Sequence, residues 1–372
     1  MHPGDILKSL FSDAHPIQAI EKEIARLDSE TVTIAIIGRS GTGKSSLINA
    51  LYGQKIAKTG STETTQSRSD YEVNGFKVLD LPGSSTLHFP INSYFDDIQV
   101  SDADAFILTV AKRVYEDDLF LLKTVRKKYK KDLHIVRSMI DQEAHAAAYD
   151  GTDLSSVLKK IRTDLSEKCI SDFDPLVNSK IQKFWLISAH NPTLYDFPSF
   201  LETLIDELPT RKREKLIYST QAYTQKLLDE KKALARKQVL LFAGLSAANG
   251  FNPLLGVDLA ADIAIITKMN QWILKCFKLN SENLESNFAK SFHSPHFQSI
   301  VKKVLSYGAK EFAIMTIKSQ AKRLTTKEVA KWIPIMGQFT AAGIGFTSVA
   351  WLGNELIDKC CETILELLEL ET

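Results

Sequence analysis

Cysteine is scarce in this chain, and its few cysteines follow no regular spacing. Four occur among 372 residues, at Cys169, Cys276, Cys360 and Cys361. These positions match neither the ligand spacing of a zinc site nor an even disulfide framework. Thiols of this kind are typical of a reducing compartment, so we expect the protein to be cytoplasmic.

Neither sign of charge is in excess. The 46 basic and 45 acidic residues leave a formal net charge of +1. Nucleic-acid-binding domains usually carry a strongly basic surface, and we therefore expect no nucleic-acid partner. The chain begins with MHPGDILKSLF, which has no apolar core and no glycine at position 2. From such a start we expect neither a signal peptide nor N-myristoylation.

The chain also has no repeat of solenoid period and no low-complexity tract. Hydrophobic residues make up 44% and charged residues 24%, which is ordinary for a globular protein. A chain of this length usually holds about two domains.

The clearest chemical signal is a glycine-rich loop. Residues 32–37 are an apolar run typical of a buried parallel strand, and GRSGTGKS follows. This G-x-x-x-x-G-K-S pattern wraps backbone N–H groups around a phosphate chain. Lys44 then reaches the β- and γ-phosphates, and Ser45 offers its hydroxyl to Mg²⁺. The loop residues expected to bind the nucleotide are Gly38, Arg39, Ser40, Gly41, Thr42, Gly43, Lys44, Ser45 and Ser46.

A polar, threonine-rich segment follows at residues 58–66, KTGSTETTQ. In nucleotide switches, a threonine at this place ligates Mg²⁺ and senses the γ-phosphate. The candidates are Thr62, Thr64 and Thr65. A solvated turn is the alternative interpretation of the segment.

A third metal ligand is expected at the end of a strand. Residues 67–81 indicate two strands around Asn74-Gly75, a strong hairpin signal, and the second strand ends at Asp80. An aspartate there holds Mg²⁺ through water, and the N–H of Gly83 meets the γ-phosphate. Residues 84–101 are irregular and suit a second switch.

The glutamine that usually positions the attacking water is missing after Gly83. Ser84, Ser85 or Thr86, which follow, would be poor substitutes. The missing function could come from backbone groups, from Arg39, or from a partner in trans. For Arg39 the simpler interpretation is a solvated loop side chain.

Two further segments indicate recognition of guanine. The tetrad that follows the strand LHIVR is Ser138, Met139, Ile140 and Asp141. Asp141 can accept two N–H bonds from guanine, a pair that adenine does not offer. Met139 stands where a lysine usually covers the ring, and its thioether still covers a π face. A last strand at 184–187 is followed by Ser188, Ala189 and His190, where the backbone meets the guanine O6.

With these motifs in order, the chain resembles the immunity-related (interferon-inducible) GTPases. Their switch motif KTG-x-x-E-x-T resembles AKTGSTETTQ and places the threonine on Thr65. Their DLPG…NFP-x-x-x-Y motif resembles DLPGSSTLHFPINSYF, and their FVRTK-x-D motif resembles HIVRSMID. Their YDFP…DLP-x-x-KR stretch is similar to YDFPSFLETLIDELPTRKR. The resemblance is close over residues 16–215 and general elsewhere.

The resemblance implies a dynamin-like GTPase that binds GTP and GDP. Such proteins form dimers or oligomers through their nucleotide faces and act at intracellular or vacuolar membranes. It therefore implies a cytoplasmic protein that associates peripherally with intracellular membranes. Lys44 places the chain with the branch expected to hydrolyse GTP, not with the regulatory branch that has Met there. The chain departs from the family pattern at Arg39, Ser40 and Met139.

The expected architecture is an α/β P-loop GTPase domain with a doubly wound, mostly parallel six-stranded sheet, joined to an all-α domain. We place the GTPase domain at 31–210 and the helical domain at 211–372. Residues 1–30 contain an amphipathic helix, from Pro16, that packs on the C-terminal domain. In the helical domain the first helix is expected at 211–238.

Two stretches of the C-terminal half carry no charge, at 239–257 and 332–354. A buried helical hairpin, shallow membrane insertion and a true span are the alternatives, and the second stretch is long enough to cross a bilayer. Cys360-Cys361 could be acylated, although core cysteines are the simpler interpretation.

For the reaction, we expect water to attack the γ-phosphate while Lys44 and Mg²⁺ stabilise the developing charge. Mg²⁺ would be held by Ser45, Thr65 and Asp80, and Gly83 completes the expected catalytic set. One alternative is a nucleotide-gated module that binds a membrane or a partner and hydrolyses negligibly. Another is an Era-like housekeeping GTPase, although no RNA-binding module is recognisable.

Overall fold

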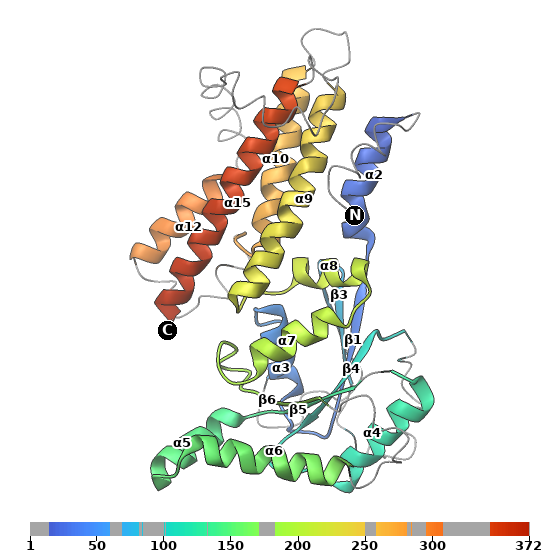
Figure 1. Ribbon diagram of the computed structural model, residues 1–372, viewed down its shortest axis with the longest axis vertical. Coiled ribbons are helices and arrows are strands. Elements are labelled where there is room, and N and C mark those ends of the chain that lie inside the picture. Colours follow the sequence, from blue (N-terminus) through green and yellow to red (C-terminus); the bar gives the residue numbers. More distant parts are fainter. Residues whose placement is uncertain are drawn as a thin grey trace. The chain divides into compact units, whose positions relative to one another are not determined.

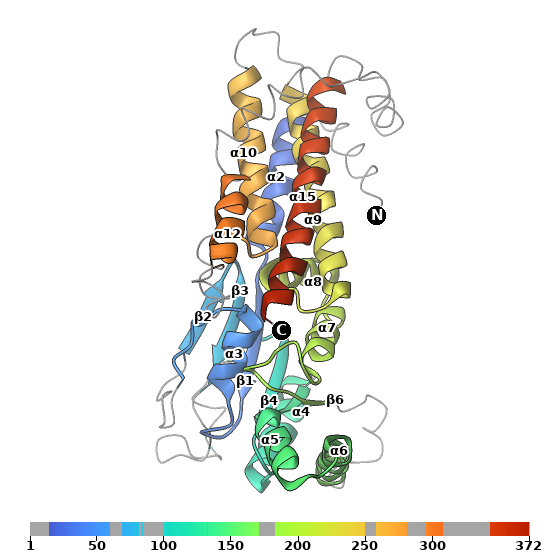
Figure 2. The same ribbon diagram turned by 90° about the vertical axis from the view of Figure 1, so that its left-hand side faces the viewer.

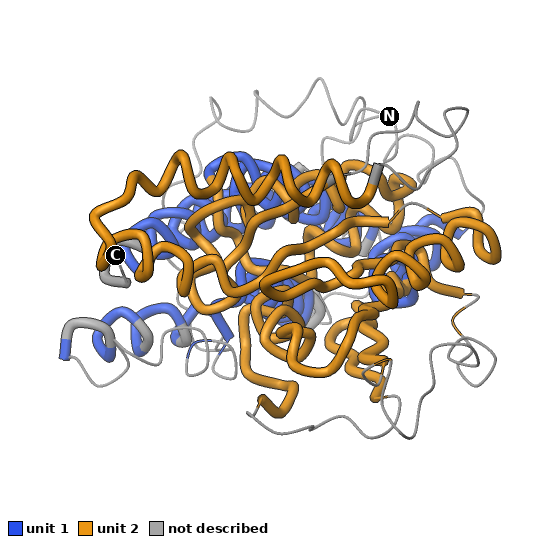
Figure 3. Tube along the Cα trace, turned by 90° about the horizontal axis from the view of Figure 1, so that it is seen from below, with its two compact units in different colours: residues 1–30, 225–372 blue, residues 31–224 orange. Residues whose placement is uncertain are grey.

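The computed structural model describes residues 15–59, 69–81, 84, 100, 102–131, 133–170, 183–249, 258–280, 284, 295–307 and 343–371. The chain divides into two compact units, which Figure 3 shows in different colours. One unit is Thr31–Thr224, and the other combines Met1–Glu30 with Gln225–Thr372.

The unit Thr31–Thr224 is built on one six-stranded sheet (Figure 1). Its strands are β1 (Val32–Ile37), β2 (Ser69–Val73), β3 (Phe76–Asp80), β4 (Ala105–Val110), β5 (Leu133–Arg137) and β6 (Lys183–Leu186). Their order is β2-β3-β1-β4-β5-β6. Strand β2 pairs antiparallel with β3 across the Asn74-Gly75 turn, and the other pairs are parallel. The prediction of a mostly parallel sheet is confirmed.

Both faces of this sheet are buried over β1, β3, β4 and β5, as the continuous apolar runs of these strands predict, whereas the edge strand β2 is not buried. Its helices are α3 (Lys44–Tyr52), α4 (Glu116–Tyr129), α5 (Ile140–Asp150), α6 (Leu154–Ile170), α7 (Phe197–Asp206) and α8 (Thr210–Ser219). On one face, α4 and α6 share a core with the alternate strand residues Ala35, Ile37 and Leu108. Ile34 and Ile36 point to the opposite face and are equally buried, which is the doubly wound arrangement.

The expected domain boundary at residue 210 differs from the boundary that the structure shows, which follows Thr224. Helix α8 belongs to the sheet unit because it packs on β1 and β3. Its last residue, Ser219, donates to the Asn74 carbonyl at 3.2 Å. The single helix expected at 211–238 is wrong. Thr220 takes an extended backbone and ends α8, and a new helix begins at Gln225.

The second unit is helical. Its helices are α2 (Pro16–Ser29), α9 (Gln225–Asn249), α10 (Asp258–Cys276), α12 (Pro295–Tyr307) and α15 (Gly343–Glu371). Helix α9 packs against α15, α10 and the N-terminal helix α2 (Figure 2). Ile20 and Leu27 of α2 are buried, and Gln238 of α9 donates to the Ile24 carbonyl at 3.3 Å. Segments from both ends of the chain thus lie together in one unit.

The described parts of the two uncharged stretches lie within helices of this unit. Residues 239–249 continue α9, and residues 343–354 begin α15, which packs along α9. The two backbones come close, since a Cβ on Gly353 would lie 2.5 Å from a methyl carbon of Val239. Within the described residues no helix combines the length and apolar character that crossing a membrane requires. Residues 250–257 and 332–342 lie outside the described part of the chain.

Candidate nucleotide-binding site

The glycine-rich loop connects β1 to α3, and two of its glycines are held in conformations that other residues rarely adopt. Gly38 has φ +143° and Gly43 has φ +85°. A Cβ on Gly38 would collide with the Thr109 carbonyl, and one on Gly43 would lie 3.2 Å from Ser138 Oγ. Glycine is therefore required at both ends, because the loop must turn sharply against β4 and β5.

Lys44 is the first residue of α3, and its side chain turns back into the loop. The side chain is buried, and its ammonium donates to the carbonyls of Gly38, at 3.2 Å, and Arg39, at 3.1 Å. The N-terminal end of α3 adds the positive end of its dipole. The loop therefore surrounds a cation, which is the electrostatic arrangement that a phosphate ligand needs.

Thr42 has a different place from the one the motif alone indicates. Its side chain is buried, and Thr42 Oγ1 bonds to the Arg39 carbonyl, at 2.9 Å, and to Thr109 Oγ1, at 2.7 Å. The Thr42 carbonyl accepts from Ser138 Oγ at 2.7 Å. Thr42 thus joins the phosphate loop to β4 and to the base tetrad, and its hydroxyl serves the loop itself.

Two oxygen groups meet where a magnesium ion is expected. The parallel register of β1 and β3 places Asp80 opposite Ile36, beside the loop. Ser45 Oγ donates to Asp80 Oδ2 at 3.4 Å, and Asp80 is fully buried. A hydroxyl and a carboxylate are hard oxygen ligands of the kind that Mg²⁺ prefers, so the pair fits this ion.

Several expected switch residues cannot be placed in this geometry. Thr62, Thr64, Thr65 and Gly83 lie outside the described residues. Ser84 is described, and its N–H donates to the Gly38 carbonyl at 3.3 Å. Its side-chain hydroxyl is buried and has no hydrogen-bond partner among the described residues. A buried hydroxyl beside the phosphate loop is thus left for a ligand or a water.

Arg39 is held by α4, in contrast to the simpler interpretation of a solvated loop side chain. Its guanidinium lies 3.6 Å from the centre of the Tyr115 ring. Its Nε donates to Asp118 Oδ1 at 3.3 Å. The backbone carbonyl of Arg39 accepts from Lys44, and the nucleotide-binding role expected for Arg39 stays a prediction.

The base tetrad lies between β5 and α5. Met139 adopts φ +60° and starts α5, which places Asp141 in the first helical turn. Asp141 Oδ1 is buried and has no hydrogen-bond partner among the described residues. Such an oxygen is unfavourable unless a ligand bonds to it, and an N–H donor would satisfy it. The Met139 Cε atom lies 3.8 Å from the place of a Cβ on Gly43, so the tetrad borders the phosphate loop.

Arg137 is a residue of this site that the sequence reasoning missed. It is buried, and its guanidinium donates to the Ser138 carbonyl, at 2.6 Å, and to Glu143 Oε1, at 2.7 Å. Burial lowers the pKa of Arg137, and the Glu143 carboxylate opposes that shift. Arg137 therefore ties the tetrad to the first turns of α5. An arginine that ends an apolar strand, with an acid six residues later on a helix, is the signal that could have indicated it.

The segment after β6 also reaches the tetrad. The Ile187 N–H donates to the Arg137 carbonyl, and the Ile140 N–H donates to the Ile187 carbonyl. Ser188, which follows, is fully buried, and its Oγ accepts from the Asn191 N–H at 3.3 Å. Of the other residues expected here, Ala189 is partly buried and His190 is exposed.

Tyr195, from the YDFP segment, is close enough to feel the Asp141 charge. Burial raises the pKa of Tyr195, and the negative charge of Asp141 adds to the shift. The structure thus brings the loop, Asp80, the tetrad and the end of β6 to one edge of the sheet. This is where the carboxyl ends of parallel strands form ligand sites.

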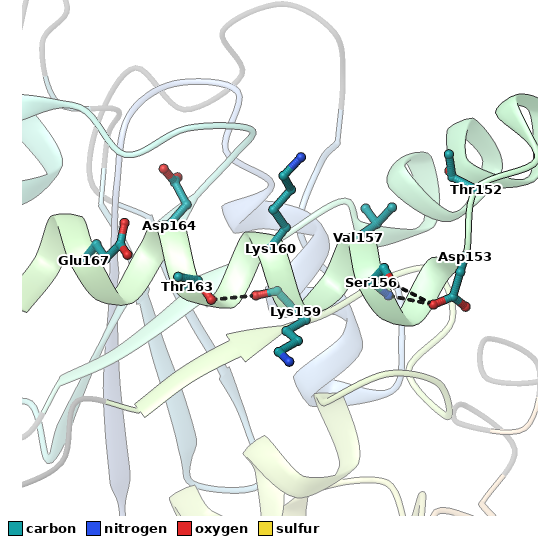
Figure 4. A pocket seen from close by; sticks show the side chains of 9 residues that line it. All are labelled: Thr152, Asp153, Ser156, Val157, Lys159, Lys160, Thr163, Asp164 and Glu167. Carbon is teal, nitrogen blue, oxygen red and sulfur yellow. Dashed lines mark hydrogen bonds between the residues drawn. The ribbon is translucent and has the colours of Figure 1, made fainter.

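A separate pocket of ≈ 710 Å³ lies on α6 (Figure 4). Its lining residues are Thr152, Asp153, Ser156, Val157, Lys159, Lys160, Thr163, Asp164 and Glu167. None belongs to the phosphate loop or the base tetrad. Asp153 is occupied in a cap, because it accepts bonds from Ser155 and Ser156 that lower its pKa to about 2.

Comparisons with known proteins show which sequences and structures this chain is similar to. The family described as Interferon-inducible GTPase (IIGP) matches residues 13–370. Interferon-gamma-inducible GTPase 10 of Mus musculus is 27% identical, over 95% of this chain and 84% of that protein. Interferon-inducible GTPase 5 of Rattus norvegicus is 25% identical, over 96% of this chain and 80% of that protein. Among solved structures, the FeoB G-domain of Methanococcus jannaschii is 22% identical over 47% of this chain and 96% of that one, with a TM-score of 0.29.

Proposed function

This chain belongs to the interferon-inducible GTPase family, and on that premise we propose that its site hydrolyses Mg²⁺-bound GTP to GDP and phosphate. The observation that carries the proposal is the pairing of a buried lysine in a glycine loop with a buried, unpartnered aspartate oxygen in the base tetrad. The first suits a phosphate chain and the second suits the N–H groups of guanine.

The phosphate end of the reaction depends on Lys44. Phosphoryl transfer passes through a loose transition state, so catalysis consists mainly of positioning and of charge stabilisation. The loop N–H groups orient the phosphates, and the Lys44 ammonium balances the charge that develops on the leaving oxygen. The carbonyls of Gly38 and Arg39 already hold this ammonium inside the loop.

Ser45 and Asp80 are the described residues that would hold Mg²⁺, and the family resemblance adds Thr65. A bound Mg²⁺ supplies positive charge to the β- and γ-phosphate oxygens. The Ser45 hydroxyl would ligate directly, and Asp80 would act through water, as its strand-end position predicts. The Asp80 carboxyl group is held in position by burial at the end of β3.

Base selection depends on Asp141. Its carboxylate accepts the two N–H groups of guanine, which adenine lacks. We expect the wild-type protein to bind GDP at least 100-fold more tightly than ADP, a difference of about 2.7 kcal/mol. Asp141→Asn should remove most of this preference, since the amide offers a donor where an acceptor is needed. Titration with fluorescent GDP and ADP in the presence of Mg²⁺ measures the two affinities. Equal affinities in the wild type would contradict the proposal.

We further propose that turnover occurs in a nucleotide-dependent dimer or oligomer. The support is the family resemblance and the missing water-positioning glutamine, which a partner in trans could replace. Turnover per molecule should then rise with protein concentration. A rate that stays negligible at every concentration favours the alternative of a nucleotide-gated binding module.

The last part of the proposal is cytoplasmic location with peripheral association to an intracellular membrane surface, which the family resemblance supports. Flotation with liposomes tests this association directly. More protein should float with GTP than with GDP, because only the triphosphate orders the switch segments. Equal recovery with both nucleotides would remove the nucleotide dependence from the proposal.

A further inference from the structure

Arg39 connects the phosphate loop to the first turn of α4. It follows the first glycine of the loop, and its side chain leaves the loop to stack on Tyr115. The same guanidinium forms an ion pair with Asp118, with Nε 3.3 Å from Oδ1. A guanidinium suits both contacts, because it stacks on aromatic faces while its N–H groups bond to a carboxylate.

The burial of Asp118 strengthens its ion pair with Arg39. Its carboxylate is fully buried, and its second oxygen accepts the Tyr115 N–H at 3.0 Å, which caps α4. Burial raises the pKa of Asp118, while the Tyr115 N–H and Arg39 oppose that rise. A buried carboxylate that loses its cation is strongly unfavourable. The fold therefore favours the conformation in which Arg39 remains paired with Asp118.

The backbone of Arg39 holds the lysine that binds phosphate. Its carbonyl accepts from Lys44 Nζ at 3.1 Å and from Thr42 Oγ1 at 2.9 Å. One residue therefore contacts α4 through its side chain and Lys44 through its carbonyl. A shift of Arg39 would move the carbonyl that positions the ammonium.

The two ends of the loop are anchored, and its tip is open. Thr42 anchors one end through Thr109 and Ser138. Ser40 and Gly41 at the tip are exposed, and a Cβ on Gly41 would meet nothing within 4 Å among the described residues. Arg39 adds a second anchor, because its side chain ties the loop to Tyr115 and Asp118.

We propose that Arg39 is a positioning residue, which through Asp118 and Tyr115 orders the phosphate loop before the nucleotide binds. This inference rests on the proposed GTP binding and concerns the same site. A loop that is already ordered loses less conformational freedom on binding. Once a nucleotide is bound, its phosphates hold the loop and Lys44 in the ordered conformation. The contacts of Arg39 with α4 therefore act on nucleotide affinity and leave the chemical step unchanged.

The test uses the full chain, Mg²⁺ and a fluorescent N-methylanthraniloyl GDP. Arg39→Ala should weaken binding about tenfold, which corresponds to about 1.4 kcal/mol. Asp118→Asn should weaken binding by a similar factor. The double variant should bind GDP as tightly as the single variant with the lower affinity, because the two substitutions remove the same interaction. In steady-state hydrolysis the KM for GTP should rise, while kcat stays within about twofold.

Variants of Tyr115 test the same contact without changing a buried residue. Tyr115 is 50% exposed, so its replacement leaves the core intact even where Asp118→Asn fails to fold. Tyr115→Phe keeps the aromatic face and should bind like the wild type, whereas Tyr115→Ala should bind several-fold more weakly. The matched control is Arg213→Ala, which removes an exposed ion pair with Asp206 in the same unit and should leave affinity unchanged.

Three results would overturn the inference: unchanged affinity in Arg39→Ala, additive losses in the double variant, or a fall in kcat with KM unchanged. A wild-type protein that fails to bind the fluorescent GDP would instead overturn the proposed function, and the inference with it. If the wild type binds the fluorescent GDP and Arg39→Ala binds it with the same affinity, only the inference is overturned.

Discussion

At the scale of single residues, the site is marked by buried polar atoms of two kinds. Lys44 and Thr42 are bonded to the loop and make it stiff. Asp141 Oδ1 and Ser84 Oγ are buried and have no hydrogen-bond partner among the described residues. Each such atom costs about 1–3 kcal/mol if it stays unsatisfied, so the second kind indicates where a ligand completes the structure.

Met139 offers a direct test of base stacking. A lysine in its place would add a cation close to the purine ring. We expect Met139→Lys to tighten GDP binding by about 1 kcal/mol, roughly fivefold in Kd. Met139→Leu is the control, because it keeps an apolar cover without the charge and should stay within about twofold of the wild type. Weaker binding of the lysine variant would show that Met139 does not lie over the base.

Two lysines are buried around the end of α10. Lys231 Nζ donates to the Cys276 carbonyl at 2.7 Å, and Lys278 Nζ is buried with no hydrogen-bond partner among the described residues. Burial lowers the pKa of Lys231 to about 8. Burial and the nearby Lys231 charge together lower the pKa of Lys278 to about 7, while Cys276 opposes the shift. Each ammonium therefore destabilises the folded helical unit while it is charged.

The stability of this unit should depend on pH in a definite direction. Between about pH 7 and the usual lysine pKa of 10.5, the unfolded chain binds more protons than the folded chain. The free energy of unfolding therefore rises with pH over this window and is lowest below it. Lys278→Met should raise the free energy of unfolding at pH 6 by roughly 2–4 kcal/mol and flatten the rise.

Denaturant unfolding followed at several pH values measures this effect. Lys275→Met is the matched control, because Lys275 lies three residues away on the exposed side of α10. It should change neither the stability at pH 6 nor the pH dependence. A Lys278→Met protein that is less stable than the wild type at pH 6 would contradict the argument.

At the scale of elements, the ends of helices decide how this fold closes. Helix α3 is followed by Gly53 and α5 by Gly151, and both glycines cap their helix in the left-handed conformation, with φ +67° and +64°. Their surroundings differ. A Cβ on Gly53 would lie 2.8 Å from Gln221 Cβ, whereas one on Gly151 would meet nothing within 4 Å among the described residues.

The two glycines therefore separate backbone strain from crowding. Gly151→Ala should cost about 1 kcal/mol, the penalty of a left-handed non-glycine residue. Gly53→Ala has the same penalty and must also displace the segment at Gln221. We therefore expect it to lower the free energy of unfolding by about 2–4 kcal/mol in total. Thermal unfolding midpoints of the two variants measure the difference, and equal losses would show that the Gln221 contact yields without strain.

At the scale of the whole molecule, the position of the boundary decides which part folds as the nucleotide-binding unit. The residues up to Thr224 contact the sheet unit closely. The Tyr223 hydroxyl donates to the Ala50 carbonyl at 2.8 Å, and Thr224 Oγ1 donates to Glu202 at 2.6 Å. Tyr223 also packs edge-on against Phe197 of α7.

A fragment of residues 31–224 should therefore fold and bind GDP, whereas a fragment of residues 31–210 should not. The shorter fragment lacks α8 and Tyr223, which exposes apolar surface on β1 and β3. Circular dichroism melting and binding of fluorescent GDP compare the two fragments. Equal melting midpoints would place the boundary at residue 210 after all.

The local motifs of the site could be predicted from the sequence because their chemistry depends on spacing along the chain. Gly38, Gly43 and Lys44 lie within one loop, and their roles follow from the order strand, loop and helix. The resemblance carried by the YDFP and DLPG segments predicted the family, and the comparison confirms it. The mostly parallel sheet followed from continuous apolar runs, which only a strand covered on both faces can bury.

Only the tertiary structure decided which distant groups meet. Arg39 and Asp118 are 79 residues apart, and Thr42 and Thr109 are 67 residues apart. No local pattern reports such pairs, because they depend on the order of strands in the sheet. For the same reason the sequence left open whether Arg39 was solvated, and the boundary expected from it at residue 210 differs from the one that the structure shows. Spacing determined which residues can bind a nucleotide, and packing determined which partners hold them in place.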